Sequence, residues 1–91
     1  MKIVVNRCYG GFSLSQKAYE FLGLKWDDFG FEYSDHDLRT DPKLIECVET
    51  LGEDANGRWA VLEVVEIPDN ISWGIDEYDG VETIHETHRV W

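Results

Sequence analysis

Basic side chains are scarce in this sequence, which has 8 Lys and Arg against 19 Asp and Glu and a formal net charge of −11 at pH 7. Proteins gain affinity for DNA, RNA and anionic lipid surfaces largely from Lys and Arg. The shortage therefore disfavours direct nucleic-acid and membrane partners. A surplus of carboxylates suits a basic protein partner instead, although acidity can also serve solubility alone.

Long apolar runs are missing as well. No stretch approaches the roughly 18 apolar residues that would span a bilayer, and the opening Met1–Val5 run is too short for the core of a signal peptide. We therefore expect a protein of the cytoplasm. Cysteine is limited to Cys8 and Cys47, without the spacing of a disulfide framework, so both are predicted to be free thiols.

The motifs of common catalytic and metal sites are also lacking. The sequence contains no CxxC, HExxH or calcium-loop pattern, and no Lys-Ser or Lys-Thr follows its double glycine as in a P-loop. His85 and His88 would point to opposite faces of a strand, which disfavours a shared metal. A hydrolase that uses Cys8 with one of the histidines is a minor alternative, because nothing in the sequence places them together. We predict no metal, no cofactor and no catalytic residue.

The residues that are present predict one α+β domain over residues 1–91. A hydrophobic fraction of 43% and an aromatic fraction of 13% suffice for a compact core. Apolar periodicity predicts about four strands in one sheet packed with two helices, in the order strand, helix, helix, strand, strand, strand. The expected strands are Met1–Cys8, Arg58–Ile67, Ile71–Glu77 and Val81–His85, and the expected helices are Leu14–Leu22 and a second from Pro42 to Gly52.

Several features within these elements carry further expectations. Ser13 and Gln16 have the spacing of a capping box, which would begin the first helix at Ser13. Asp41 and Pro42 have the pattern of a helix N-cap followed by proline at the first helical position. Trp59 and Trp73 alternate with apolar neighbours on predicted strands, so we expect both to fill the core.

The turn at Gly10–Gly11, between the first strand and the first helix, is the most informative stretch. Glycines there allow positive φ or the close approach of a backbone or a ligand, and N–H groups at a helix start can hold a phosphate or carboxylate. A tight connection without any ligand is the equally weighted alternative. The candidate ligand-binding residues are Arg7, Cys8, Tyr9, Gly10, Gly11, Ser13, Arg39 and Arg89.

The connector, residues 24–40, is aromatic and acidic and is long for a structureless loop, so we expect a packed functional segment or a hidden short strand. Aromatic anchors with acidic neighbours suit an interface with a basic partner. The candidate partner-binding residues are Trp26, Asp27, Asp28, Phe29, Phe31, Glu32, Tyr33, Asp35 and Asp37.

Four blocks carry a resemblance to a known group of proteins: residues 1–12 with the Cys8–Phe12 turn, Asp41–Glu46, Ile75–Gly80 and His88–Trp91. Together they resemble a family of small proteins encoded by bacteriophages and prophages, without an assigned activity, over nearly the full length. The resemblance implies a phage-borne accessory protein in the host-cell cytoplasm. Inhibitors of bacterial immunity and traps for signalling nucleotides are frequent in that class.

The sequence thus predicts a non-catalytic binding protein, an inhibitor of a host anti-phage defence factor. The alternative is a trap for a small anionic ligand or nucleotide at the Gly10–Gly11 turn. Open sheet edges gain protection by pairing, so the sequence also allows a homodimer.

Overall fold

The computed structural model describes residues 1–86 and 89–90 and has the expected α+β composition and order. Its strands are β1 (Lys2–Asn6), β2 (Leu62–Glu66), β3 (Gly74–Tyr78), β4 (Val81–Glu86) and β5 (Arg89–Val90). Its helices are α1 (Gln16–Leu22) and α2 (Pro42–Leu51), with short 3-10 helices η1 (His36–Leu38) and η2 (Gly52–Ala55).

The strands form two separate sheets, so the prediction of a single sheet is wrong. β1 pairs antiparallel with β2, and β3, β4 and β5 form the second sheet in that order. The edge of β1 that faces away from β2 is occupied by other groups: the Val4 N–H donates to the carbonyl of Arg39 and the Asn6 N–H to the Glu82 carboxylate. Because these groups take the hydrogen bonds that a neighbouring strand would make, β4 does not pair with β1.

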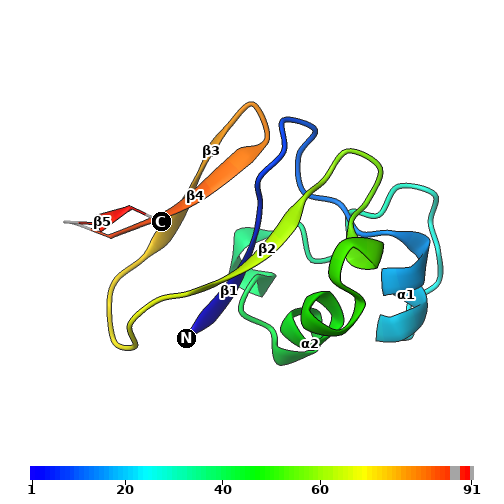
Figure 1. The fold of residues 1–91 in the computed structure, drawn as a ribbon, viewed down its shortest axis with the longest axis horizontal. Helices are drawn as coiled ribbons and strands as arrows, with labels where there is room; N and C mark the ends of the chain where they lie inside the picture. The colour runs from blue at the N-terminus through cyan, green and yellow to red at the C-terminus, as the bar shows by residue number, and fades with distance from the viewer. Residues whose placement is uncertain (87–88, 91) are drawn as a thin grey trace.

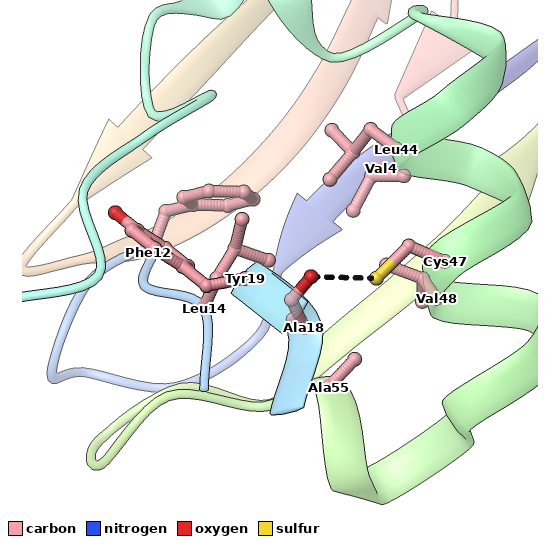
Figure 2. Close-up of a cluster of buried hydrophobic side chains, with 9 residues drawn as sticks. All are labelled: Val4, Phe12, Leu14, Ala18, Tyr19, Leu44, Cys47, Val48 and Ala55. Carbon is pink, nitrogen blue, oxygen red and sulfur yellow. Dashed lines mark hydrogen bonds between the residues drawn. The ribbon is translucent and has the colours of Figure 1, made fainter. Parts of the chain in front are cut away.

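The β1–β2 pair separates two apolar clusters, with the helices on one side and the β3–β4 hairpin on the other (Figure 1). Side chains alternate along β1, so Val4 enters the helical cluster while Ile3 and Val5 pack with Ile84 of β4. In Figure 2, α1 and α2 face each other across this helical cluster, and Cys47 lies opposite Ala18. Apolar residues on both faces of β2 predict a central strand, but among the described strands β2 pairs only with β1 and is not central in its sheet. Its two apolar faces instead pack against the two clusters.

The helix ends are partly as expected. Asp41 caps α2 by accepting from the Lys43 N–H, and Gly23 ends α1 with a φ of 74°, as the sequence predicts. The predicted cap at Ser13 is wrong, because α1 begins after Ser15, whose hydroxyl accepts from the Ala18 N–H. Ser13 lies before the helix, outside any helix or strand, and its carbonyl accepts from the Gly57 N–H.

The second half of the chain follows the predicted strands, with one correction. β2 begins only at Leu62, and Trp59 is 64% exposed with the Arg58 guanidinium 5.3 Å from its ring centre. Trp59 therefore does not fill the core, because the residues before β2 form turns rather than strand. Trp73 does pack against the cluster around Ile84. Both cysteines are free, as predicted.

Candidate functional site

At the Gly10–Gly11 turn, the segments around Trp59 and Gly80 approach the backbone closely. A Cβ atom on Gly10 would lie 2.0 Å from the Cβ of Trp59, and one on Gly80 would lie 2.4 Å from the Tyr9 carbonyl oxygen. Gly80 belongs to the tight β3–β4 turn, where Asp79 and Gly80 both have positive φ, as in a type I′ hairpin. Close packing of two turns thus explains why glycine stands at these positions.

An open cavity of about 540 Å³ lies at this corner and is lined by Tyr9, Gly10, Gly11, Glu77, Asp79 and Gly80. The two carboxylates make its wall negative, which disfavours a phosphate. The helix dipole offers no help to an anion, because α1 begins only at Gln16 and is short. The cavity therefore lies where the sequence predicted a ligand, but its charge suits a cation.

The structure does not bring the other ligand candidates into this cavity. Arg7 donates to the Glu63 carboxylate at 2.9 Å and to the Glu82 carbonyl at 2.9 Å. The Cys8 backbone exchanges hydrogen bonds with the side chain of Asn6, and Ser13 is buried against Gly57. Only the backbone of Arg89 is described, in β5, and His88 and Trp91 lie outside the described residues.

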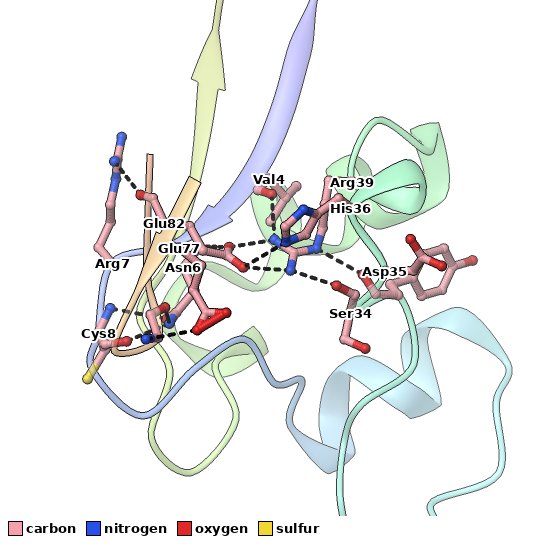
Figure 3. Close-up of polar contacts among 12 residues, drawn as sticks. Val4, Asn6, Arg7, Cys8, Ser34, Asp35, His36, Arg39, Glu77 and Glu82 are labelled. Atoms are coloured by element: carbon pink, nitrogen blue, oxygen red, sulfur yellow. Dashed lines mark hydrogen bonds and ion pairs between the residues drawn. The ribbon is translucent and has the colours of Figure 1, made fainter. Parts of the chain in front are cut away.

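Arg39 is the centre of a buried polar junction that joins the connector to the hairpin (Figure 3). Arg39 is only 1% exposed. Its guanidinium makes a bidentate ion pair with the Glu82 carboxylate, with distances of 2.5 Å from Nη1 to Oε1 and 2.8 Å from Nη2 to Oε2. It also donates to the carbonyls of Tyr33, Ser34 and Val4. The Phe12 ring covers it, with a centre 3.8 Å away. Arg39 is thus saturated by internal partners and does not face a ligand cavity.

Asn6 is the second member of this buried polar junction. Its side-chain amide donates to the carbonyls of Cys8 and Gly80, and its oxygen accepts from the Val61 N–H. One buried side chain therefore ties the end of β1 to the hairpin turn and to the entry of β2. The backbone groups that come together there have partners, as burial demands.

The first part of the connector is organised around Asp27. Its Oδ1 accepts from the N–H groups of Phe29 and Gly30, both at 2.9 Å, and its Oδ2 accepts from the Tyr19 hydroxyl at 3.1 Å. The hydrogen bonds from Gly30 and Phe29 lower the pKa of Asp27 below the usual 3.8. Asp27 is therefore a structural acid that folds the turn.

This turn presents two phenylalanines to solvent. Gly30 is buried against the backbone of Leu14, where a Cβ would lie 2.2 Å from the Leu14 carbonyl oxygen. Its neighbours Phe29 and Phe31 point outward, 69% and 59% exposed, with ring centres 6.2 Å apart and planes within 15°. The exposed acids Asp28 and Glu32 flank them in the chain. We call Asp28, Phe29, Phe31 and Glu32 the aromatic patch.

Of the remaining partner candidates, the two aromatic residues pack inward and two acids lie on the surface. Trp26 packs edge-on against Tyr19, with ring centres 5.0 Å apart, and Tyr33 packs on the helical cluster, where burial raises its pKa. Asp35 caps η1 by accepting from the Asp37 N–H, and both acids are exposed. Apart from η1, the described connector holds no helix or strand, so the hidden strand allowed by the sequence is not formed.

Sequence reasoning missed Glu82, Asn6, Glu77 and Asp79. Glu82 falls at a buried position of an alternating strand, which could have signalled the need for a buried cation. The signal for Asp79 was the Asp-Gly turn itself, although nothing along the chain indicates that this turn meets Gly10–Gly11.

Comparisons with family models, curated proteins and solved structures returned no match to this chain. Among the described residues, no helix is long and apolar enough to cross a membrane. No group of three potential metal ligands gathers in that part of the chain.

Proposed function

We propose that this chain is a non-catalytic binding protein that holds a basic partner protein through its aromatic patch. The observation that carries the proposal is the stacked, solvent-exposed pair Phe29–Phe31. Large apolar rings on a monomer surface mark interaction sites when they form a patch, and aromatic residues dominate the binding energy of interfaces.

Three features support a rigid and acidic contact surface. The hydrogen bonds to Asp27 and the burial of Gly30 fix the backbone that carries both rings, which reduces the entropy lost on binding. Asp28 and Glu32 lie beside the rings, and the chain has a net charge of −11. Such a field attracts a basic partner and speeds its association at low salt.

The resemblance to phage and prophage proteins suggests which partner this is. In a cell under infection, a small acidic binder without catalytic groups would act by occupying a host defence factor, and we propose that role for this chain. The partner is then a bacterial protein with a basic surface that the aromatic patch covers.

Removal of charge without change of shape tests this proposal. Asp28→Asn with Glu32→Gln removes two negative charges from the patch, and asparagine tolerates the positive φ of Asp28. We expect weaker capture of the partner from bacterial lysate and a weaker dependence of capture on salt. The control, Glu20→Gln with Glu46→Gln, removes two exposed charges from α1 and α2. Equal capture by both double variants would argue against the patch.

A small-ligand trap at the Gly10–Gly11 turn is the second candidate function, and the cavity of about 540 Å³ favours it. Glu77 and Asp79 suit a cationic ligand better than a nucleotide. Calorimetry with spermidine and with ATP distinguishes the two ligand classes. Absence of heat from either compound at millimolar concentration would remove this candidate.

The Cys8-dependent hydrolase remains an untested prediction. The described hydrogen bonds of Cys8 involve its backbone and run to the Asn6 side chain and the Gly11 N–H. Activity that disappears in Cys8→Ser would establish an enzyme and would overturn the proposal of a non-catalytic binder.

A further inference from the structure

One edge of β2 pairs with no strand among the described residues. In the β1–β2 pair, the N–H groups of Val4 and Asn6 point away from β2, because they donate to Arg39 and Glu82. Val64 lies opposite Val4 and Leu62 opposite Asn6, so the backbone groups of these β2 residues point away from β1. The Leu62 N–H donates to the Asn56 side chain in that direction, which confirms the orientation.

Val64 and Glu66 share this outward orientation, since residues two apart on a strand point the same way. Within residues 1–86 and 89–90, their N–H and C=O groups have no hydrogen-bond partner. A row of free donors and acceptors on a strand edge is a template for one more strand.

A groove runs beside this edge. It has a volume of about 770 Å³ and is lined by Val48, Gly52, Glu53, Asn56 and residues 61–64. Val61 is half exposed, and Leu62 and Val64 are only partly buried at the border of the helical cluster. The free edge thus has an apolar recess next to it that can take a side chain of an added strand.

The charge around the groove selects the occupant. Glu53 lines the groove and Glu66 is exposed at the end of β2, whereas the Glu63 carboxylate is already paired with Arg7. A second copy of this chain would bring the same net charge of −11 to the edge. An extended segment with basic residues complements these acids and meets no such repulsion.

We propose that the free edge of β2 binds an extended basic segment of another protein, which adds as a third strand to the β1–β2 sheet. The partner's backbone pairs with Val64 and Glu66, alternate apolar side chains enter the groove, and lysines or arginines complement Glu53 and Glu66. This site is separate from the aromatic patch in sequence and does not depend on it.

The test is an NMR titration of the full chain with a short capped peptide of alternating lysine and valine. We expect the amide signals of Val64 and Glu66 to shift and to become protected from hydrogen exchange. The amides of Ile3 and Val5 belong to the existing ladder with β2, so their protection serves as the internal reference.

Two matched peptides examine the mechanism. N-methylation of the central valine removes one backbone donor and should weaken binding by about tenfold, which corresponds to one hydrogen bond. A peptide of alternating glutamate and valine should not bind. If the methylated peptide bound as tightly as the unmodified lysine peptide, strand addition would be wrong. If the glutamate peptide bound as tightly as the lysine peptide, the charge argument would be wrong.

Matched variants of the protein complete the experiment. Glu53→Lys should weaken the lysine peptide several-fold, whereas Glu46→Lys, an exposed change on α2 outside the groove, should not. Phe29→Ala with Phe31→Ala should leave this binding unchanged, even if it abolishes partner capture. Shifts at Val64 and Glu66 that grow with protein concentration alone would identify a second copy as the occupant. That result, or no shift with millimolar peptide, would contradict the proposal.

Discussion

Arg39 and the Phe29–Phe31 pair lie in the same acidic connector, yet their environments are opposite. The guanidinium of Arg39 is buried, paired with Glu82 and covered by Phe12. The two phenylalanine rings stack on each other in solvent, where apolar side chains gain nothing for the fold. In this segment the charged group stabilises the structure and the apolar groups are available to a partner.

The comparison shows that residue type alone does not separate folding from binding. A charge becomes structural when a distant strand supplies its counter-ion, here Glu82, 43 positions later. An aromatic ring becomes available when its backbone is held by another group, here Asp27 and the buried Gly30.

The largest loss of folding stability is expected from substitution of the buried Arg39. Arg39→Ala leaves Glu82 as an uncompensated buried carboxylate and removes donors to three carbonyls. We expect a loss of about 3–5 kcal/mol in the free energy of unfolding, measured by urea denaturation. A loss below about 1 kcal/mol would show that the junction does not hold the fold.

A double variant separates the charge from the packing. Arg39→Met with Glu82→Leu removes both buried charges, so no unpaired ion remains. The combined loss should be smaller than the sum of the two single losses by about 1–3 kcal/mol. Additive losses would mean that the pair is not coupled.

The next effect concerns the two turns that meet beside the polar junction. In Gly80→Ala the new methyl group would lie 2.4 Å from the Tyr9 carbonyl oxygen, at a φ of +91°. We expect a loss of about 2–4 kcal/mol from positive φ and overpacking together. Gly23→Ala is the control, because its φ is +74° but nothing lies within 4 Å, and it should lose about 1–2 kcal/mol. Equal losses would contradict the close contact of the turns.

A smaller, pH-dependent effect is expected at Asp27. Backbone hydrogen bonds hold its pKa in the folded protein below 3.8. Its contribution to stability is therefore present above that pH and is lost as the pH falls through the lowered pKa. Asp27→Asn should be less stable than the wild type at neutral pH, and the difference should narrow below pH 3.8. A constant difference across that range would show that the charge is not responsible.

Much of the fold was readable from local signals. The caps at Asp41 and Gly23, the Asp79–Gly80 turn and the alternation of β3 and β4 all depend on residues near each other in sequence. The split into two sheets was not readable, because it depends on Arg39 and Glu82 occupying the far edge of β1. No local pattern shows which strand edge a distant carboxylate will cover.

The candidate site divides in the same way. Aromatic and acidic composition pointed to the connector, and the structure exposes Phe29 and Phe31 there. Composition could not distinguish these rings from Trp26 and Tyr33, which pack inward, because that depends on where Tyr19 and α2 lie. Trp59 was misplaced for a related reason: its strand begins three residues later, and Gly10 packs against its Cβ.

Removal of the exposed rings of Phe29 and Phe31 should have the smallest effect on folding stability and the largest effect on partner binding. Phe29→Ala with Phe31→Ala removes two exposed rings, so the free energy of unfolding should change by no more than about 0.5 kcal/mol. Phe21→Ala, which removes an exposed ring from α1, is the matched control. Both variants should unfold like the wild type.

Capture of the partner by these two variants, at equal folded concentration, is the most direct measurement of the division between fold and contact surface. We predict that the Phe29→Ala and Phe31→Ala double variant loses a partner that both the wild type and Phe21→Ala retain. Retention of the same partner by the double variant would contradict it.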